Sequence, residues 1–179
     1  MAPNRDTDRP EVDDYWERSG ESLADRDLVL RSGGLEDVDA ILDIEQQAHP
    51  TPWSREIFER ELALDWSHLW LVVEPGEGGD EEGDETVAFL IFWTVHDEIH
   101  ILNVAVTPSR RRQGIATDLI AALVTAGRQR AYAFITLEVR ETNTAAIELY
   151  RQMGFETMGE REEYYADTGE AALLMQCML

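Results

Sequence analysis

The sequence predicts one domain of the mixed α/β (α+β) class, and three observations lead to this prediction. Apolar residues recur with the period of strands or of helices in the order β-α-α-β-β-β-α-β-α-β-β. The chain has 179 residues, 44% of them hydrophobic, which suits a single domain with a substantial core. No internal repeat divides the chain into smaller units.

The first strand and the first helix follow a polar N-terminal segment. Residues 27–33 alternate apolar and polar side chains, which is typical of a strand, and residues 35–49 have helical spacing. The apolar stripe of that helix comprises Val38, Ile41, Leu42, Ile44 and Ala48, with Glu45 on the same face. The segment "HPTPW" then ends the helix, because proline cannot continue it.

A second helix and three strands come next. Ser54 is a candidate N-cap for a helix over residues 55–64, in which Phe58 and Leu62 stand one turn apart. Three strands are predicted over residues 68–74, 86–95 and 99–106. The last two are apolar enough to be central in a sheet.

The C-terminal half predicts two helices and three strands. A helix over residues 114–131 has Leu119 and Leu123 on its apolar face, and Gly154 stops the second helix. The last two strands form a closing antiparallel pair. The predicted segments are, in order, 114–131 (helix), 132–139 (strand), 143–153 (helix), 155–166 (strand) and 169–179 (strand).

Two acidic segments lie outside this pattern. Residues 1–26 are polar and aperiodic, which predicts a disordered tail, and residues 75–85 are an acidic, glycine-rich loop. The folded domain is therefore expected to cover residues 27–179.

The charge of the chain restricts its partners and its setting. The sequence has 37 acidic residues and 15 basic ones, all arginine, for a net charge of −22. Such a field repels nucleic acids and anionic membranes, so neither is expected as a partner. Acidity spread along the chain favours a high-salt, halophilic setting. The single cysteine, Cys177, and the lack of a signal peptide or a long apolar span favour the cytoplasm.

The segment "RRRQGIAT", residues 110–117, is the first candidate functional feature. It lies where a strand gives way to a helix, so unpaired amides and the helix dipole would favour a phosphate there. Gly114 allows close approach of a phosphate to the backbone, and the arginines can donate paired hydrogen bonds to phosphate oxygens. The alternative is a solvated turn whose arginines pair with nearby carboxylates.

The spacing favours the phosphate site. "RRQGIA" fits R/Q-x-x-G-x-G/A, the pyrophosphate signature of the GNAT superfamily of acyl-CoA-dependent N-acyltransferases. "NVAVTPSRRRQGIATDLI", "LEVRETNTAAIELYRQMGF" and "EYYADTGEAALLM" follow in the order of that family. The chain resembles the family over residues 27–179 and within it the RimI-type enzymes, which acetylate protein N-terminal amines, including those of ribosomal proteins.

The resemblance implies a GNAT fold and a binding site for acetyl-CoA as co-substrate. The fold has a central, mostly antiparallel sheet flanked by helices, with a cofactor cleft between two central strands. Asn143 corresponds to a cofactor-contacting asparagine, although it is also a good helix N-cap. The strand and loop residues that correspond to the cofactor site are Asn103, Val104, Ala105, Val106, Arg111, Arg112, Gln113, Gly114, Ile115, Ala116 and Thr117.

The resemblance also implies two catalytic residues. Glu138 corresponds to the general base that takes a proton from the amine, and Tyr150 corresponds to the general acid, in contact with the cofactor. A protonated phenol is available at neutral pH, because its pKa is near 10. The alternatives are a solvent-facing strand glutamate and an amphipathic core tyrosine.

Substrate contacts and competing functions remain open at this stage. Trp53, Tyr164 and Tyr165 match the segments that frame a peptide entrance, although strand packing explains the tyrosines equally well. No metal site is expected, because His96 and His100 lack further ligands. The alternatives are an acetyltransferase for a small-molecule amine and a non-catalytic acyl-CoA-binding module. Residue types do not decide the oligomeric state.

Overall fold

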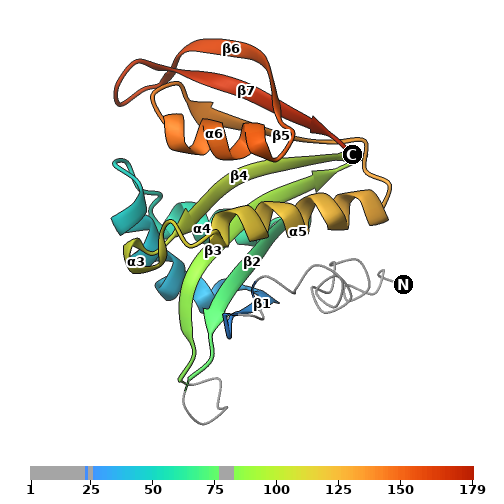
Figure 1. Ribbon diagram of the computed structural model, residues 1–179. Helices are drawn as coiled ribbons and strands as arrows, with labels where there is room; N and C mark the ends of the chain where they lie inside the picture. Colours follow the sequence, from blue (N-terminus) through green and yellow to red (C-terminus); the bar gives the residue numbers. More distant parts are fainter. Residues whose placement is uncertain (1–22, 24–25, 77–82) are drawn as a thin grey trace, which may run out of the picture.

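The computed structural model describes residue 23 and residues 26–76 and 83–179. Within these residues seven strands form one sheet of order β1-β2-β3-β4-β5-β7-β6 (Figure 1). Neighbouring strands are antiparallel except β4 and β5, which are parallel. The strands are β1 (Val29–Ser32), β2 (Ser67–Glu74), β3 (Glu85–Val95), β4 (Glu98–Val106), β5 (Phe134–Arg140), β6 (Glu156–Tyr165) and β7 (Glu170–Met178).

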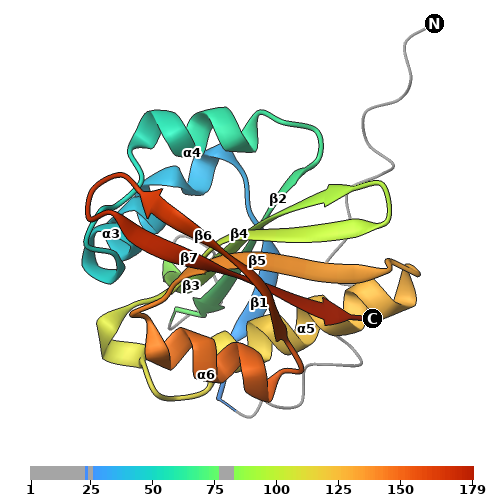
Figure 2. The same ribbon diagram turned by 90° about the horizontal axis from the view of Figure 1, so that it is seen from above.

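Helices cover both faces of the sheet. Figure 2 shows α3 and α4 on one side of the strands and α5 and α6 on the other. Two short 3₁₀ turns precede helices on the chain. The helical segments are η1 (Leu35–Asp37), α3 (Val38–Ala48), α4 (Arg55–Leu62), η3 (Pro108–Arg110), α5 (Ile115–Gln129) and α6 (Thr144–Gln152). The predicted mixed α/β class, element order and closing β6–β7 pair are confirmed.

The core is divided between the two faces of the sheet. Phe58 and Leu62 of α4 are buried together with the apolar stripe of α3 against one face. Leu119 and Leu123 of α5 are buried against the other face, together with Phe155 and Ile147. Each helix buries the stripe that its 3.6-residue period predicts, because that stripe is the apolar surface available for packing on the sheet.

The predicted helix boundaries have different physical causes. Ser54 occupies the N-cap of α4, but its side chain makes no capping hydrogen bond to the helix. Asn143 does cap α6, since its Oδ1 accepts a hydrogen bond of 3.2 Å from the backbone N–H of Ala146. Gly154 follows α6 with φ of +88°, a left-handed conformation that glycine adopts without steric cost.

Strands β4 and β5 separate partway along their length, which creates the space for a site. Their pairing begins at Glu98↔Phe134 and ends at Ile101↔Leu137. Leu102 is an extra residue in the ladder, because Ile101 pairs with Phe92 and Asn103 with Ile91. This β-bulge bends β4 at the point where the pairing with β5 ends.

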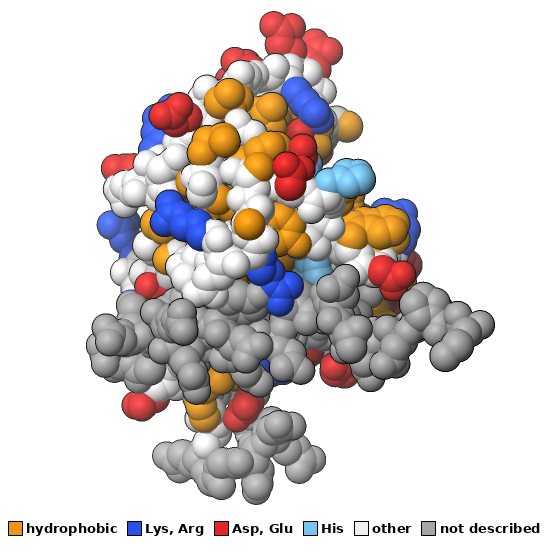
Figure 3. Space-filling view, turned by 90° about the vertical axis from the view of Figure 1, so that its right-hand side faces the viewer, with side chains coloured by type: hydrophobic (Ala, Val, Ile, Leu, Met, Phe, Trp, Pro, Cys, Tyr) orange, Lys and Arg blue, Asp and Glu red, His pale blue; other side chains and the backbone are white. Residues whose placement is uncertain are grey.

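The two acidic segments fall mostly outside the described residues. Of the predicted tail, residues 1–26, the structure describes Leu23 and Arg26, and Leu23 is buried. Of the predicted loop, residues 75–85, residues 77–82 are outside the described part. Figure 3 shows acidic side chains spread from top to bottom of one face, with basic ones between them. Among the described residues, no helix combines the length and apolarity needed to cross a membrane.

Candidate active site

A pocket of about 500 Å³ opens between β4 and β5 where the strands separate. The segment after α3 and the start of α6 complete its walls. It brings together many of the residues that the sequence assigned to a site: Trp53, Asn103, Val104, Ala105, Val106, Arg111, Glu138, Asn143, Tyr150 and Tyr165. The other assigned residues do not line it: Arg112, Gln113, Gly114, Ile115, Ala116, Thr117 and Tyr164.

The backbone of β4 is available to a ligand in this pocket. Residues 103–106 pair with β3 on one side, whereas the pairing of β4 with β5 has ended at Ile101. A strand edge without a partner strand presents N–H and C=O groups, so it can bind an extended, amide-containing molecule by adding hydrogen bonds like those of a strand.

The loop before α5 has the backbone geometry of an anion site. Arg112 and Gly114 both adopt left-handed conformations, with φ of +60° and +83°. The first helical hydrogen bond runs from the N–H of Asp118 to the carbonyl oxygen of Gly114, at 3.0 Å. The preceding amides of residues 115–117 therefore have no acceptor within the helix, and the helix dipole adds positive potential there.

The three consecutive arginines of this loop have different surroundings. Arg110 forms an ion pair with Glu74. Arg111 donates to the carbonyl oxygens of Val106 and Gln47, both at 3.1 Å, and so ties the loop to the ends of β4 and α3. Arg112 is exposed. The solvated-turn alternative thus describes Arg110, whereas Arg111 holds the loop against the pocket.

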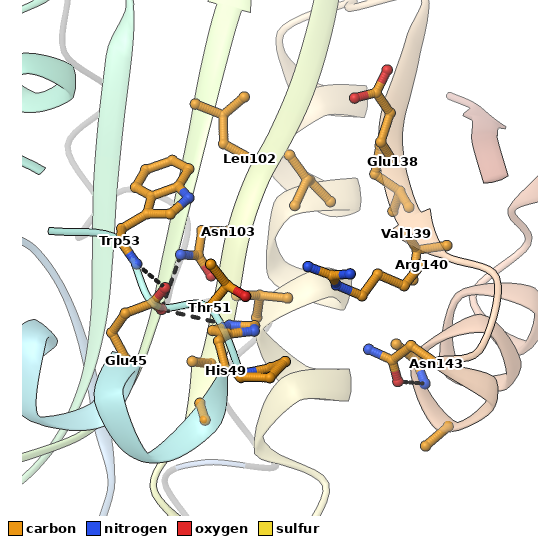
Figure 4. Close-up of a pocket in the computed structure, with 18 of the residues that line it drawn as sticks. Glu45, His49, Thr51, Trp53, Leu102, Asn103, Glu138, Val139, Arg140 and Asn143 are labelled. Carbon is orange, nitrogen blue, oxygen red and sulfur yellow. Dashed lines mark hydrogen bonds and ion pairs between the residues drawn. The ribbon is translucent and has the colours of Figure 1, made fainter. Parts of the chain in front are cut away.

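Glu138 lies on β5, on the opposite side of the pocket from Asn103 and Trp53 (Figure 4). Its carboxylate forms a 2.6 Å ion pair with Arg161 of β6. The Glu138 carboxylate, together with partial burial, raises the pKa of the Tyr164 hydroxyl to about 12. Glu138 is therefore in a cleft with polar partners, and not on an open solvent face.

Tyr150 lies on the inner face of α6 and lines the same pocket. Its ring packs against Phe155, with centroids 5.6 Å apart. Burial is the main cause that raises the pKa of its hydroxyl above 10, and the nearby Tyr165 adds to it. The phenol is thus held in its protonated form at neutral pH, while its ring is also part of the core. Tyr150 is thus a buried core residue that also lines the pocket.

Glu45 is a buried carboxylate that sequence reasoning placed only on the face of a helix. It is 1% exposed and lines the pocket. Its oxygens accept hydrogen bonds from the backbone N–H of Trp53 (2.9 Å) and from Nδ2 of Asn103 (3.0 Å). His49 Nε2 lies 3.5 Å from the same carboxylate (Figure 4). The sequence signal for this role is an acidic residue on the apolar stripe of a helix. A carboxylate on that stripe is buried, and a buried carboxylate needs hydrogen-bond donors or a positive charge as partners.

Arg140, at the end of β5, is a second site residue that was missed. It pairs with Asp167 at 2.8 Å and Glu170 at 3.0 Å. Its guanidinium lies 3.8 Å from the centroid of the Tyr165 ring. Asp167 also accepts a hydrogen bond from Thr51, in the segment after α3. These contacts join the β6–β7 turn to the opposite wall of the pocket.

In the part of the chain that the structure describes, the other polar groups do not assemble a metal centre. Within residues 26–76 and 83–179 and at residue 23, no three His, Cys, Asp or Glu side chains are grouped as a metal site would require. His100 pairs with Glu98 at 2.8 Å, and Cys177 is a buried thiol whose pKa burial raises.

Residues 38–155 match the acetyltransferase (GNAT) family. The ribosomal protein bS18-alanine N-acetyltransferase of Escherichia coli is 36% identical over 141 residues, which cover 78% of this chain and 89% of that protein. The Haemophilus influenzae protein of the same name is 30% identical over 146 residues, covering 80% and 93%. The crystal structure of the ribosomal-protein-S18-alanine N-acetyltransferase from E. coli superposes with a TM-score of 0.74 and 32% identity, covering 84% of this chain and 93% of that one.

Proposed function

Because the chain belongs to the acetyltransferase (GNAT) family, we propose that it transfers an acetyl group from acetyl-CoA to the N-terminal α-amine of a ribosomal protein. The supporting observation is the pocket between β4 and β5, which offers a free strand edge on one wall and Glu138 and Tyr150 on the other. The identity to the E. coli and H. influenzae enzymes extends over 78% and 80% of this chain and supports a RimI-like substrate.

The donor would bind along β4 and the following loop. The backbone of Asn103, Val104, Ala105 and Val106 suits the amide-rich pantetheine arm, since that edge lacks a partner strand. The pyrophosphate suits the amides between Arg112 and Thr117, where Gly114 permits close approach. Asn143 caps α6 at the pocket wall, so its role as a cap is compatible with a cofactor contact.

The chemistry needs a proton acceptor for the amine and a proton donor for the leaving sulfur. Acetyl-CoA, when bound, supplies a thioester carbon that the amine can attack. Glu138 is the carboxylate that accepts a proton from the amine, directly or through a water, because an N-terminal amine has a pKa of about 8. Tyr150 is the proton donor for the sulfur, since burial keeps its phenol protonated. Placing both reactants in one pocket contributes the rest of the rate.

The peptide would enter between the segment after α3 and the β6–β7 turn. Trp53 and Tyr165 line the pocket at these two walls, and Tyr164 stacks edge-on against Tyr165 with centroids 5.1 Å apart. The influence of Glu138 on the pKa of Tyr164 links this peptide-facing pair to the proposed general base. We assign these three aromatic residues to the acceptor peptide.

The setting follows from composition. With a net charge of −22 and no lysine, the enzyme is proposed to act in a cytoplasm of high salt, with neither nucleic acid nor membranes as partners.

The test offers the purified protein acetyl-CoA and a panel of peptides that differ in their first residues, in high-salt buffer. Mass spectrometry should show one acetyl group on the α-amine of peptides that match a ribosomal-protein N-terminus. Acetylation of a polyamine but of no peptide would favour a small-molecule amine instead. Binding of acetyl-CoA with no transfer to any amine would leave a non-catalytic acyl-CoA-binding module.

A further inference from the structure

Arg26 lies against the loop that precedes α5, although the sequence places this residue in the N-terminal tail. Its Nη1 donates a hydrogen bond to the carbonyl oxygen of Gln113, and its Nη2 forms a 3.1 Å ion pair with Oδ2 of Asp118. A Cβ atom built on Gly114 would lie 3.3 Å from the same Nη2. The guanidinium therefore touches both the loop and the first turn of α5.

A packed turn holds Arg26 in this position. The backbone N–H groups of Arg26 and Leu28 both donate to the carbonyl oxygen of Leu23, at 2.9 and 3.1 Å. Leu23 is 1% exposed and belongs to the same apolar cluster as Leu28 and Ile115. Leu23 and Leu28 thus anchor the chain on either side of Arg26 in the core beside the loop, and this anchoring limits the ordering entropy that Arg26 must lose to make its contacts.

The contact with Gln113 fixes the direction of one loop amide. The peptide bonds of the described chain are trans, so the C=O of Gln113 and the N–H of Gly114 point in opposite directions. The Arg26 guanidinium donates to the Gln113 carbonyl oxygen on one side of the loop, so the Gly114 N–H points to the opposite side. A glycine at φ of +83° has no side chain to restrain this peptide, so an external contact is needed to fix it.

The contact with Asp118 changes the local charge. Oδ2 of Asp118 is buried in the first turn of α5, close to the amides that a phosphate would use. An unpaired carboxylate there would repel an anionic ligand, and the effect would be strengthened because its Oδ2 is out of contact with solvent. The positive charge of Arg26 offsets it.

We propose that Arg26 is a positioning residue for the pyrophosphate of coenzyme A, acting from behind the loop by orienting the Gly114 amide and neutralising Asp118. Arg26, which precedes β1, is then part of the donor site. This inference rests on the proposed function, because it takes the loop before α5 as the pyrophosphate site.

The experiment compares two acetyl donors in Arg26→Ala. Acetyl-CoA carries the pyrophosphate, whereas S-acetylpantetheine has the same thioester arm without it. We expect the KM for acetyl-CoA and the Kd for coenzyme A to rise about tenfold, as expected for loss of hydrogen bonds that involve a charged group. The kcat, the KM for the peptide and kcat/KM for S-acetylpantetheine should stay near their wild-type values. A matched control is Arg151→Ala, which removes the same charge from an exposed position on α6.

A second variant separates the role of charge from a loss of folding. Asp118→Asn should leave coenzyme A affinity unchanged or improve it, and the double variant Arg26→Ala/Asp118→Asn should recover part of the loss. Recovery in the double variant cannot come from restored packing, since it restores no contact of Arg26.

The outcomes distinguish this inference from the proposed function. An equal fall in kcat/KM with both donors, or an unchanged Kd for coenzyme A in Arg26→Ala, would overturn the role of Arg26. A fall in coenzyme A affinity on Asp118→Asn alone would overturn the charge argument. If the wild-type protein transfers no acetyl group at all, the proposed function itself fails, and coenzyme A binding by calorimetry still decides whether Arg26 supports the loop.

Discussion

Asn103 of β4 donates a 3.0 Å hydrogen bond from Nδ2 to the buried carboxylate of Glu45 on α3. The other carboxylate oxygen accepts the backbone N–H of Trp53 at 2.9 Å. One carboxylate therefore fixes the strand edge proposed for the donor and the aromatic residue proposed for the peptide. Asn103 and Trp53 both donate hydrogen bonds, so the residue at position 45 must have a side chain that only accepts them.

Glu45→Gln tests this requirement. The amide of Gln presents an NH₂ group toward one of two donors, so a buried donor loses its partner and the free energy of unfolding should fall by about 1–3 kcal/mol. Urea denaturation measures this change, and the KM for the peptide should rise because Trp53 is released. Glu148→Gln on the exposed side of α6 is the control and should leave both quantities unchanged. Equal stability of the two variants would contradict the role of Glu45.

Glu138→Gln and Tyr150→Phe test the proposed proton transfers. We expect each to lower kcat by about 10²-fold or more, with the Kd for acetyl-CoA nearly unchanged. Arg161→Gln is the matched control for Glu138, because it breaks the same 2.6 Å ion pair and keeps the carboxylate. Its kcat should stay within a few-fold of wild type. If Arg161→Gln lowered kcat as much as Glu138→Gln, the ion pair and not the base would explain the loss.

Local patterns account for what the sequence predicted correctly. The apolar stripes of α4 and α5 are predicted by a repeat of 3.6 residues. The end of α6 is predicted by Gly154, because glycine readily adopts the left-handed φ of +88° found there. These features depend on neighbours in the chain. The strand that flanks the pocket was also predicted, because "IHILNVAV" is apolar enough to be buried.

Long-range contacts account for what the sequence could not show. Glu45 meets Asn103 across 58 positions, and Arg26 meets Gln113 across 87. Arg140 finds Asp167 and Glu170 only when β5 pairs with β7. Periodicity assigns a residue to a face, and it cannot tell which group from another element will lie opposite it.

The buried phenol of Tyr150 predicts a loss of stability at alkaline pH. Burial raises its pKa in the folded state above the unfolded value near 10. Its contribution is therefore complete below about pH 10 and is lost as the pH rises toward the folded pKa. The free energy of unfolding, measured by urea denaturation between pH 8 and pH 11.5, should decline more steeply in wild type than in Tyr150→Phe. Parallel declines would contradict the effect of burial.

Arg140 predicts the behaviour of the pocket entrance at acidic pH. The Thr51 hydroxyl and then Arg140 lower the pKa of Asp167, and the Thr142 hydroxyl and then Arg140 lower the pKa of Glu170. The stability from these carboxylates is present above their unfolded pKa values of about 4 and is lost as the pH falls through the lower folded values. In Arg140→Gln this loss should be smaller and complete at a higher pH, because without the cation the folded pKa values lie closer to the unfolded ones. Urea midpoints between pH 7 and pH 3 measure how stability depends on pH. The control Arg151→Gln, at an exposed position of α6, should reproduce the wild-type pH dependence. The same variant should raise the KM for the peptide, since Arg140 also lies 3.8 Å from the Tyr165 ring. A wild-type pH profile in Arg140→Gln would show that the β6–β7 turn is held by other contacts.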